Sequence, residues 1–201
     1  MADLRPVIGV LALQGAYAKH ASALTAAGAE PRLVKRPAEL AGLDGLIIPG
    51  GESTTFLKHL ERDGFFEVLK EFVRETPTFG TCAGAILLAN GVENPPQASL
   101  GVMDMTVERN AYGRQIDSAI MTGPTELAGG DLEMVFIRAP RIAETGKEVE
   151  VLARRDGDAV LVRQGHLLAA TFHPELSEDG RVHELFVELV KKHQAGLARR
   201  S

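Results

Sequence analysis

Thr78-Phe79-Gly80-Thr81-Cys82-Ala83-Gly84 is the segment from which the architecture can be worked out. Its first half predicts a short strand over Thr78 to Thr81, and the run Ala83 to Ala89 favours a helix. Cys82 therefore stands at a strand-to-helix elbow, where a sharp turn holds the side chain exposed at the end of a sheet. The segment predicts one strand–helix unit of an α/β protein, with the cysteine at the junction.

Strands and helices alternate on the N-terminal side of this segment. Continuous apolar runs are typical of parallel strands that are covered on both faces. Alternation with right-handed crossovers predicts a doubly wound sheet. We expect strands over Val7 to Leu13, Arg32 to Lys35 and Leu46 to Ile48, a helix over Tyr17 to Ala27 that stops at Gly28, and a helical stretch from a Ser53 or Thr54 cap to Arg74 with a break at Gly64.

The C-terminal half has a different character, because strand-like runs follow one another with turns between them. Asp156-Gly157 predicts a hairpin turn. An amphipathic helix over Glu178 to His193 closes the chain, and we interpret residues 1–201 as a single domain. The additional strands are expected over Met105 to Arg109, Gln115 to Met121, Met134 to Ile137, Glu148 to Ala153, Ala159 to Val162 and Leu167 to Phe172.

Composition excludes several classes of protein. The 201 residues are 45% hydrophobic and 24% charged, and the net charge is -5, whereas nucleic-acid-binding domains are usually basic. A single cysteine excludes an internal disulfide and any multi-cysteine zinc site. No stretch approaches roughly 18 continuous apolar residues, and Gly9 interrupts the short apolar run before the cleavage-like Ala16-Tyr17-Ala18. We therefore predict a cytoplasmic protein without a nucleic-acid or membrane partner.

Cys82 is a candidate nucleophile. Glycines on both sides allow a close backbone approach, and the next amide can point at an oxyanion. The positive end of the following helix favours a thiolate. A lone cysteine is more commonly a small buried core residue, so the elbow alone leaves both interpretations open.

His173-Pro174-Glu175 follows an apolar strand and supplies a candidate base. Residues two apart on a strand share a face, and Pro174 biases His173 toward extended geometry. A carboxylate beside an imidazole can hold one ring nitrogen protonated and leave the other free to take a thiol proton. Taken alone, the pair is more commonly a surface feature. Together with Cys82, it predicts a Cys-His-Glu triad assembled by folding.

Pro49-Gly50-Gly51-Glu52-Ser53-Thr54 follows another strand and can supply a second oxyanion donor. A phosphate-binding loop is disfavoured, because no Gly-Lys-Ser/Thr follows and Glu52 adds negative charge. No Gly-x-Gly-x-x-Gly follows the first strand, so we expect no dinucleotide. We predict no metal and no cofactor, because the remaining histidines have no ligand spacing and are expected at the surface or packed: His20, His59, His166, His183 and His193.

These motifs resemble the class I, triad-type glutamine amidotransferase family. More narrowly, they are similar to the glutaminase subunits of pyridoxal 5′-phosphate synthase. The resemblance spans nearly the whole chain and implies a flavodoxin-like doubly wound sheet with additional strands in the C-terminal half. Ala119 departs from the aromatic residue expected there, outside the site motifs. Besides Cys82 and His173 to Leu176, the matching segments are Gly9 to Gly15, Pro49 to Thr55, Gly80 to Gly84, Val107 to Gln115 and Phe136 to Pro140.

The resemblance implies hydrolysis of L-glutamine to L-glutamate and ammonia. Cys82 would attack the side-chain amide, His173 would act as base and then acid, and Glu175 would orient His173. Arginines suit the α-carboxylate of glutamine, which a guanidinium can hold in bidentate fashion. The implied oxyanion donors are the amides of Gly51 and Ala83, and the implied glutamine contacts are Gly51, Glu52, Ser53, Arg109, Ile137 and Arg138.

The resemblance also implies a partner, a barrel-shaped synthase subunit that receives the ammonia in a hetero-oligomer and makes pyridoxal 5′-phosphate. Two alternatives stay open at this point. One is a glutaminase that serves another synthase, such as imidazole glycerol phosphate synthase, although the segments around Arg109 and Arg138 disfavour it. The other is a non-catalytic flavodoxin-like module with a redox-sensitive cysteine, which has no need of His173-Pro174-Glu175.

Overall fold

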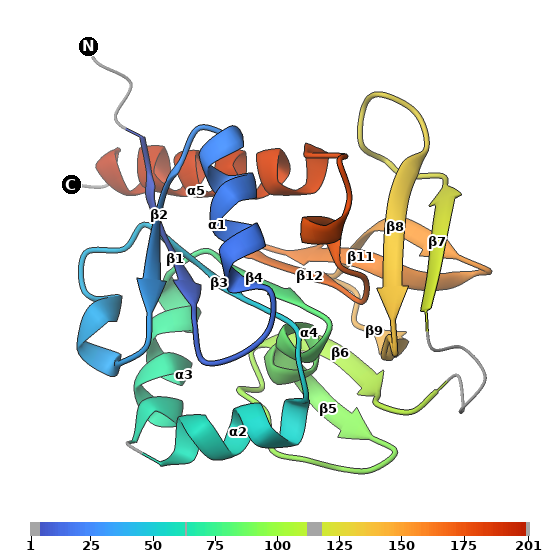
Figure 1. Ribbon diagram of the computed structural model, residues 1–201, viewed down its shortest axis with the longest axis horizontal. Coiled ribbons are helices and arrows are strands. Elements are labelled where there is room, and N and C mark those ends of the chain that lie inside the picture. Colours follow the sequence, from blue (N-terminus) through green and yellow to red (C-terminus); the bar gives the residue numbers. More distant parts are fainter. Residues whose placement is uncertain (1–4, 63, 112–117, 200–201) are drawn as a thin grey trace.

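The structure is a computed structural model that describes residues 5–62, 64–111 and 118–199 (Figure 1). Among these residues, no helix has both the length and the apolar character needed to span a membrane. The strands are β1 (Val7–Leu11), β2 (Glu30–Val34), β3 (Gly45–Ile48), β4 (Thr78–Thr81), β5 (Ala89–Glu93), β6 (Met103–Glu108), β7 (Ser118–Gly123), β8 (Leu132–Ile137), β9 (Arg141–Thr145), β10 (Glu150–Arg155), β11 (Asp158–Gln164) and β12 (Leu167–Ala170). The helices are α1 (Tyr17–Ala26), α2 (Ser53–Glu61), α3 (Phe65–Glu75), α4 (Ala83–Leu88) and α5 (Arg181–Ala198), and short 3-10 turns are η1 (Pro37–Leu40) and η3 (Pro174–Leu176).

One ten-stranded mixed sheet organises the molecule. Its order is β2-β1-β3-β4-β12-β11-β9-β6-β5, with β10 paired to β11, while β7 and β8 form a separate two-stranded sheet. The five strands from β2 to β12 run parallel. Thr81 at the end of β4 pairs with Ala170 at the end of β12. Because neighbouring parallel strands end at the same sheet edge, the residues after β4 and after β12 come together there.

Helices cover both faces of the parallel half, as the doubly wound prediction requires (Figure 1). On one face α1 and α5 pack through Leu24 and Phe186 against residues such as Phe79. On the other face α2, α3 and α4 bury Phe56, Leu69 and neighbouring side chains in a second cluster. Apolar residues point to both sides of the same strands, which explains the continuous apolar runs of the sequence.

The structure contains two strands, β5 and β9, that the sequence pattern does not predict. β5 was not predicted, because Asn90 and Gly91 are poor strand formers and only pairing with β6 holds them extended. β9 was also missed, since Ile142 is its only buried residue. The Asp156-Gly157 turn between β10 and β11 is confirmed, and both residues have positive φ, at 51° and 91°.

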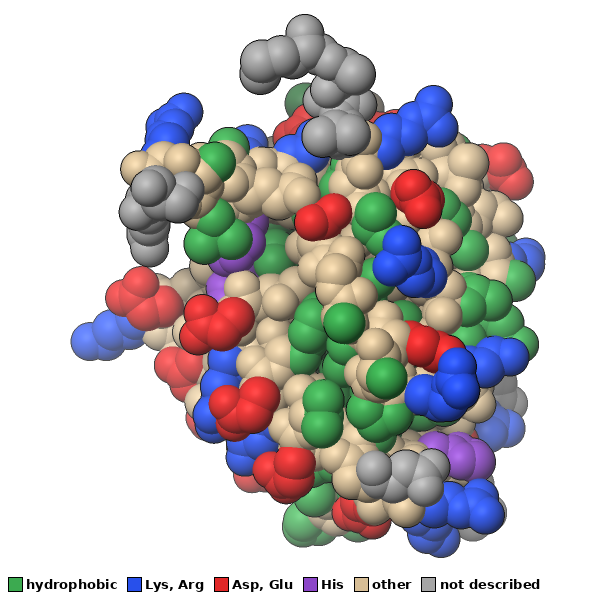
Figure 2. Space-filling view, turned by 90° about the vertical axis from the view of Figure 1, so that its left-hand side faces the viewer, with side chains coloured by type: hydrophobic (Ala, Val, Ile, Leu, Met, Phe, Trp, Pro, Cys, Tyr) green, Lys and Arg blue, Asp and Glu red, His purple; other side chains and the backbone are tan. Residues whose placement is uncertain are grey.

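Other differences concern the ends of elements. The last helix begins at Arg181 rather than at Glu178, and it continues to Ala198. Gln115 to Asp117, the start of one predicted strand, lies outside the described residues. β2 forms one edge of the sheet, and Figure 2 shows acidic and basic side chains interspersed on that side. Charged side chains along an edge, such as Glu30 and Arg32, discourage pairing with another chain.

At Gly84, the backbone of α4 comes close to the sheet. A Cβ there would collide with the backbone carbonyl of Ile48. We expect Gly84→Ala to lower the free energy of unfolding by about 1–3 kcal/mol or more, because backbone cannot move aside as a flexible side chain can. Gly196 in α5 is the matched control, since an added Cβ meets nothing within 4 Å and Gly196→Ala should be neutral or stabilising. Denaturant unfolding of both variants tests this, and equal stability would contradict it.

Candidate active site

Cys82 occupies the turn between β4 and α4 in an unusual backbone conformation, with φ 50° and ψ -105°. Its amide donates to the carbonyl of Ala170 at 2.8 Å, which ties the elbow to the end of β12. Gly80 is required beneath the turn, because a Cβ there would lie 2.5 Å from the backbone of Gly84. Cys82 is only 7% exposed, so the elbow presents its thiol to a cavity rather than to open solvent.

His173 and Glu175 lie together as predicted, but for a different local reason. Glu175 belongs to the 3-10 turn η3, so tight winding and not strand alternation brings the two side chains to one side. His173 Nδ1 lies 2.8 Å from Glu175 Oε1. The carboxylate is fully buried, whereas the imidazole is slightly exposed. Since Nδ1 is engaged by Glu175, the other ring nitrogen is left to face the cysteine.

Electrostatics favour a charged His173. Burial by itself lowers the pKa of His173, but hydrogen bonds with Cys82 and Glu175 outweigh it and raise this pKa to about 10. Burial likewise opposes ionisation of Glu175, yet its hydrogen bond with His173 and the proximity of His20 leave its pKa below the usual value. The imidazole therefore has the cysteine and the carboxylate as its neighbours, so the three groups form one row.

The loop after β3 passes directly over this row. A Cβ on Gly50 would lie 2.7 Å from the His173 ring and 3.1 Å from Cys82 Cβ, so only glycine fits there. Gly51 has φ 139°, and a Cβ on it would lie 2.5 Å from the Gln14 side chain. Gln14 Nε2 in turn donates to the Glu52 carbonyl at 3.0 Å. Gln14 therefore buttresses the loop, a contact that the sequence pattern did not indicate.

Glu52, rather than Ser53 or Thr54, caps α2. Its carboxylate accepts from the amides of Thr54 and Thr55 at 2.9 and 2.7 Å. The Thr55 hydroxyl and these amides lower the pKa of Glu52 to about 2. The Ser53 hydroxyl donates to Gln97 Oε1 at 3.0 Å. The predicted cap was wrong because a carboxylate one residue earlier reaches two free amides of the first turn.

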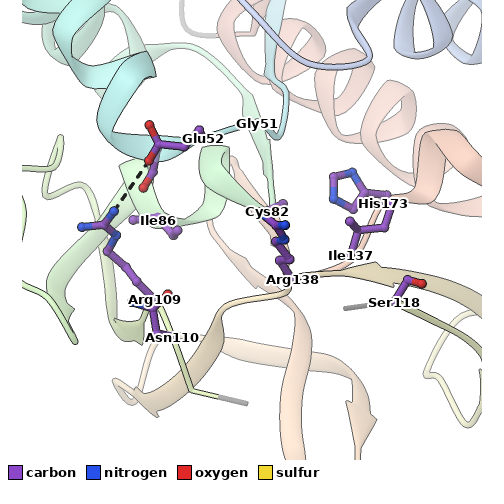
Figure 3. Close-up of a pocket in the computed structure, with 11 residues that line it drawn as sticks. Gly51, Glu52, Cys82, Ile86, Arg109, Asn110, Ser118, Ile137, Arg138 and His173 are labelled. Carbon is purple, nitrogen blue, oxygen red and sulfur yellow. Dashed lines mark ion pairs between the residues drawn. The ribbon is translucent and has the colours of Figure 1, made fainter. Parts of the chain in front are cut away.

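A cavity of about 760 Å³ opens beside these groups (Figure 3). Arg109 and Arg138 reach it from different segments. Arg109 Nη2 donates to Thr54 Oγ1 at 2.8 Å and lies 3.9 Å from Glu52 Oε1. Within the described part of the chain, Arg138 has neither a hydrogen bond nor an ion pair, and its φ is 44°. The lining residues are Gly51, Glu52, Ser53, Cys82, Ile86, Arg109, Asn110, Ser118, Ile137, Arg138 and His173.

The cavity thus contains every predicted glutamine contact. It also contains Ile86, Asn110 and Ser118, which were not predicted as site residues. Ile86 lies one turn after Cys82 on α4, so helical spacing could have pointed to it. Nothing local to Ser118 indicates that β7 borders the site. Among the described residues, no group of three or more His, Cys, Asp or Glu side chains is arranged to hold a metal ion.

Acid sensitivity follows from the buried His20. Burial lowers its pKa to about 4, against the opposing effect of Glu175. Below pH 6.5 the unfolded chain binds a proton that the folded chain excludes, so stability falls as pH falls toward 4. We expect the loss of unfolding free energy from pH 7.5 to 5 to be about 2 kcal/mol smaller in His20→Gln than in wild type. Denaturant unfolding at both pH values tests this, and equal losses would contradict it.

Comparisons with known proteins agree with the sequence and the fold. Pyridoxal 5'-phosphate synthase subunit PdxT of Koribacter versatilis (strain Ellin345) is 59% identical over 189 residues, 94% of this chain and 98% of that protein. PdxT of Thermotoga maritima is 51% identical over 186 residues, 92% and 99% of the two chains. A crystal structure of a glutamine amidotransferase has TM-score 0.85 and 47% identity, and covers 92% of this chain and 98% of the other. The model of the SNO glutamine amidotransferase family matches residues 10–192, and this chain belongs to that family.

Proposed function

We propose that the protein hydrolyses L-glutamine to L-glutamate and ammonia, with Cys82, His173 and Glu175 as catalytic residues. One observation carries the proposal: a cysteine lies beside a histidine that is itself 2.8 Å from a buried carboxylate, and both line a cavity that also holds Arg109 and Arg138. Nucleophile, base and orienting group are the parts that amide hydrolysis through a thioester requires.

The reaction uses these groups in turn. Cys82 Sγ attacks the side-chain amide carbon, and the carbonyl electrons move onto its oxygen. When the intermediate collapses, the carbon–nitrogen bond breaks, and His173 gives its proton to the departing ammonia. Water then attacks the γ-glutamyl thioester, His173 takes a proton from that water, and glutamate leaves as the sulfur is released. Glu175 holds His173 at Nδ1 throughout both halves.

Two backbone amides suit the oxyanion. Ala83 is the first residue of α4, where an amide has no carbonyl partner within the helix. Gly51 lies in the glycine loop that touches both Cys82 and His173 through Gly50. Losing one such donor typically lowers the rate by about 10²–10³-fold. Backbone strain at Cys82 and Arg138 around one cavity is typical of functional sites.

The α-carboxylate and α-ammonium groups of glutamine have complementary partners in the same cavity. Arg138 lacks a protein partner among the described residues, so its guanidinium is available for the α-carboxylate. Arg109 is already held by Thr54 and Glu52, so it shapes the wall as well as supplying charge. Glu52 offers negative charge for the α-ammonium group. Gly51, Ser53 and Ile137 complete the proposed contacts.

The proposed acceptor of the ammonia is a barrel-shaped pyridoxal 5′-phosphate synthase subunit, in a hetero-oligomer with this chain. Relatives that are 59% and 51% identical are named as subunits of that synthase, which supports this partner over another synthase. The pair of His173 and Glu175 counts against a redox-sensing module, because such a module has no need of it.

Glutamate release from glutamine, with and without the purified synthase subunit, tests the proposal. We expect release that rises when the synthase is added, together with formation of pyridoxal 5′-phosphate from its sugar phosphates. Glutamate release that does not change when this synthase is added would contradict the proposed partner, whereas the proposed hydrolysis of glutamine would stand. No release in either condition, from folded protein, would overturn the proposed function.

A further inference from the structure

A buried row of polar side chains continues behind Glu175, away from the cavity. His20 on α1 lies with Nε2 3.3 Å from Glu175 Oε2 and 3.3 Å from Thr81 Oγ1. Its Nδ1 lies 2.9 Å from His183 Nε2 on α5. His20 is 0% exposed and His183 is 1% exposed. The row therefore connects the candidate catalytic carboxylate to two helices on the far side of the sheet from α4.

Neither histidine of this row carries a charge at neutral pH. Burial lowers the pKa of His20 to about 4, and the nearby His173 acts in the same direction while Glu175 opposes it. Burial and His20 lower the pKa of His183 to about 3, again against Glu175. Glu175 consequently keeps its negative charge for His173, because the histidine behind it does not neutralise it.

The positions of the protons follow from the chemistry of the neighbours. A carboxylate only accepts, so the single N–H of neutral His20 belongs on Nε2, which faces both Glu175 Oε2 and the hydroxyl of Thr81. His20 Nδ1 is then a bare acceptor, and His183 Nε2 donates to it. This leaves His183 Nδ1 as a bare nitrogen, and that atom has no hydrogen-bond partner in the described chain. The opposite arrangement would aim a lone pair at the carboxylate and bury an unpaired N–H.

The second carboxylate oxygen of Glu175 faces His20. One carboxylate oxygen binds His173, whereas Oε2 is buried and makes no well-aligned hydrogen bond among the described residues. The His20 Nε2 contact at 3.3 Å is long and bent, as catalytic hydrogen bonds often are before substrate binds. An aliphatic side chain at position 20 would remove the His20 donor from Oε2, and a lysine would cancel the charge on Glu175.

We propose that His20 is a positioning residue for the glutaminase reaction: its Nε2–H holds the second oxygen of Glu175, so that the first stays aimed at His173 Nδ1. This inference rests on the proposed function. His183 supports this role, because its Nε2 donates to His20 Nδ1 and thereby fixes the tautomer of His20. Thr81, the residue before the cysteine, links the row to the end of β4.

Two amide substitutions test the contact, because they place their NH₂ groups differently. In His20→Gln the amide nitrogen takes the place of Nε2 and can still donate to Glu175. In His20→Asn it takes the place of Nδ1 and points toward His183 only. Both variants keep a polar, uncharged side chain on α1. Because Asn is one methylene shorter than Gln, the free energy of unfolding of each variant is measured beside kcat to separate a loss of packing from a loss of the contact. His59→Gln, on the exposed face of α2, is the matched control.

The assay is glutamate release by the complete complex with the synthase subunit, with kcat and KM for glutamine measured separately. We expect His20→Asn to lower kcat about 10- to 100-fold with KM within about twofold, since the N–H that faces a buried charge is lost. His20→Gln should stay within about threefold of wild type, and His59→Gln should be unchanged. Equal kcat values for the Asn and Gln variants, or a change confined to KM, would overturn the positioning role. An inactive wild-type complex would instead overturn the proposed function.

Discussion

Cys82→Ala is expected to lower glutamate release in the complete complex by at least about 10⁴-fold, because no intermediate can form without the sulfur. The serine hydroxyls at the cavity do not replace the sulfur. Ser53 donates to Gln97, and neither Ser53 nor Ser118 is paired with His173. A coupled glutamate assay at saturating glutamine measures the loss. Activity within tenfold of wild type would contradict the assignment of the nucleophile.

Folding and partner binding provide the control for this variant. Alanine keeps the Cβ of Cys82, so the strained backbone at φ 50° and the free energy of unfolding should change little. Cys82→Gly removes the Cβ as well and should be equally inactive, yet more stable by about 1 kcal/mol, because glycine adopts positive φ without strain. The two variants at position 82 would thus be equally inactive but would differ in their free energy of unfolding. If Cys82→Ala is unfolded, glutamate release by Cys82→Gly tests the assignment instead.

The positions of Cys82 and His173 could be predicted from the sequence because each motif ends a strand of a parallel sheet. Residues that come directly after parallel strands lie at one edge of the sheet, and β4 and β12 are neighbours there. The pairing of His173 with Glu175 was also predictable, although a 3-10 turn and not an extended strand produces it. The spacing of the motifs therefore predicts which residues come together, because different local conformations at the sheet edge can bring the same side chains into contact.

Contacts between distant elements could not be predicted. His20 and His183 are separated by most of the chain, and only the packing of α1 on α5 makes them neighbours. Each histidine alone looks like an ordinary packed or surface residue. β5 and β9 were missed for a related reason, because their residues are held extended by β6 and carry little apolar pattern of their own. Tertiary pairing overrides weak local preference in all these cases.

Glu175→Gln should lower kcat by about 10³–10⁴-fold while KM for glutamine changes little. Glu175 presents acceptors to both His173 and His20, whereas an amide has one acceptor and one donor end. If the NH₂ faces His173, the ring must carry its proton on Nε2 and cannot take one from the thiol or from water. If it faces His20, the negative charge that raises the pKa of His173 is still lost.

Glu178→Gln is the matched control for this substitution, because it makes the same chemical change three residues later on an exposed side chain. We expect wild-type kcat from Glu178→Gln and wild-type KM from both variants, since neither carboxylate lines the cavity. Glu175→Gln should also move the alkaline fall of kcat to lower pH, because His173 without its carboxylate loses its proton at lower pH. A Glu175→Gln enzyme within tenfold of wild type would mean that Cys82 and His173 act without an orienting carboxylate.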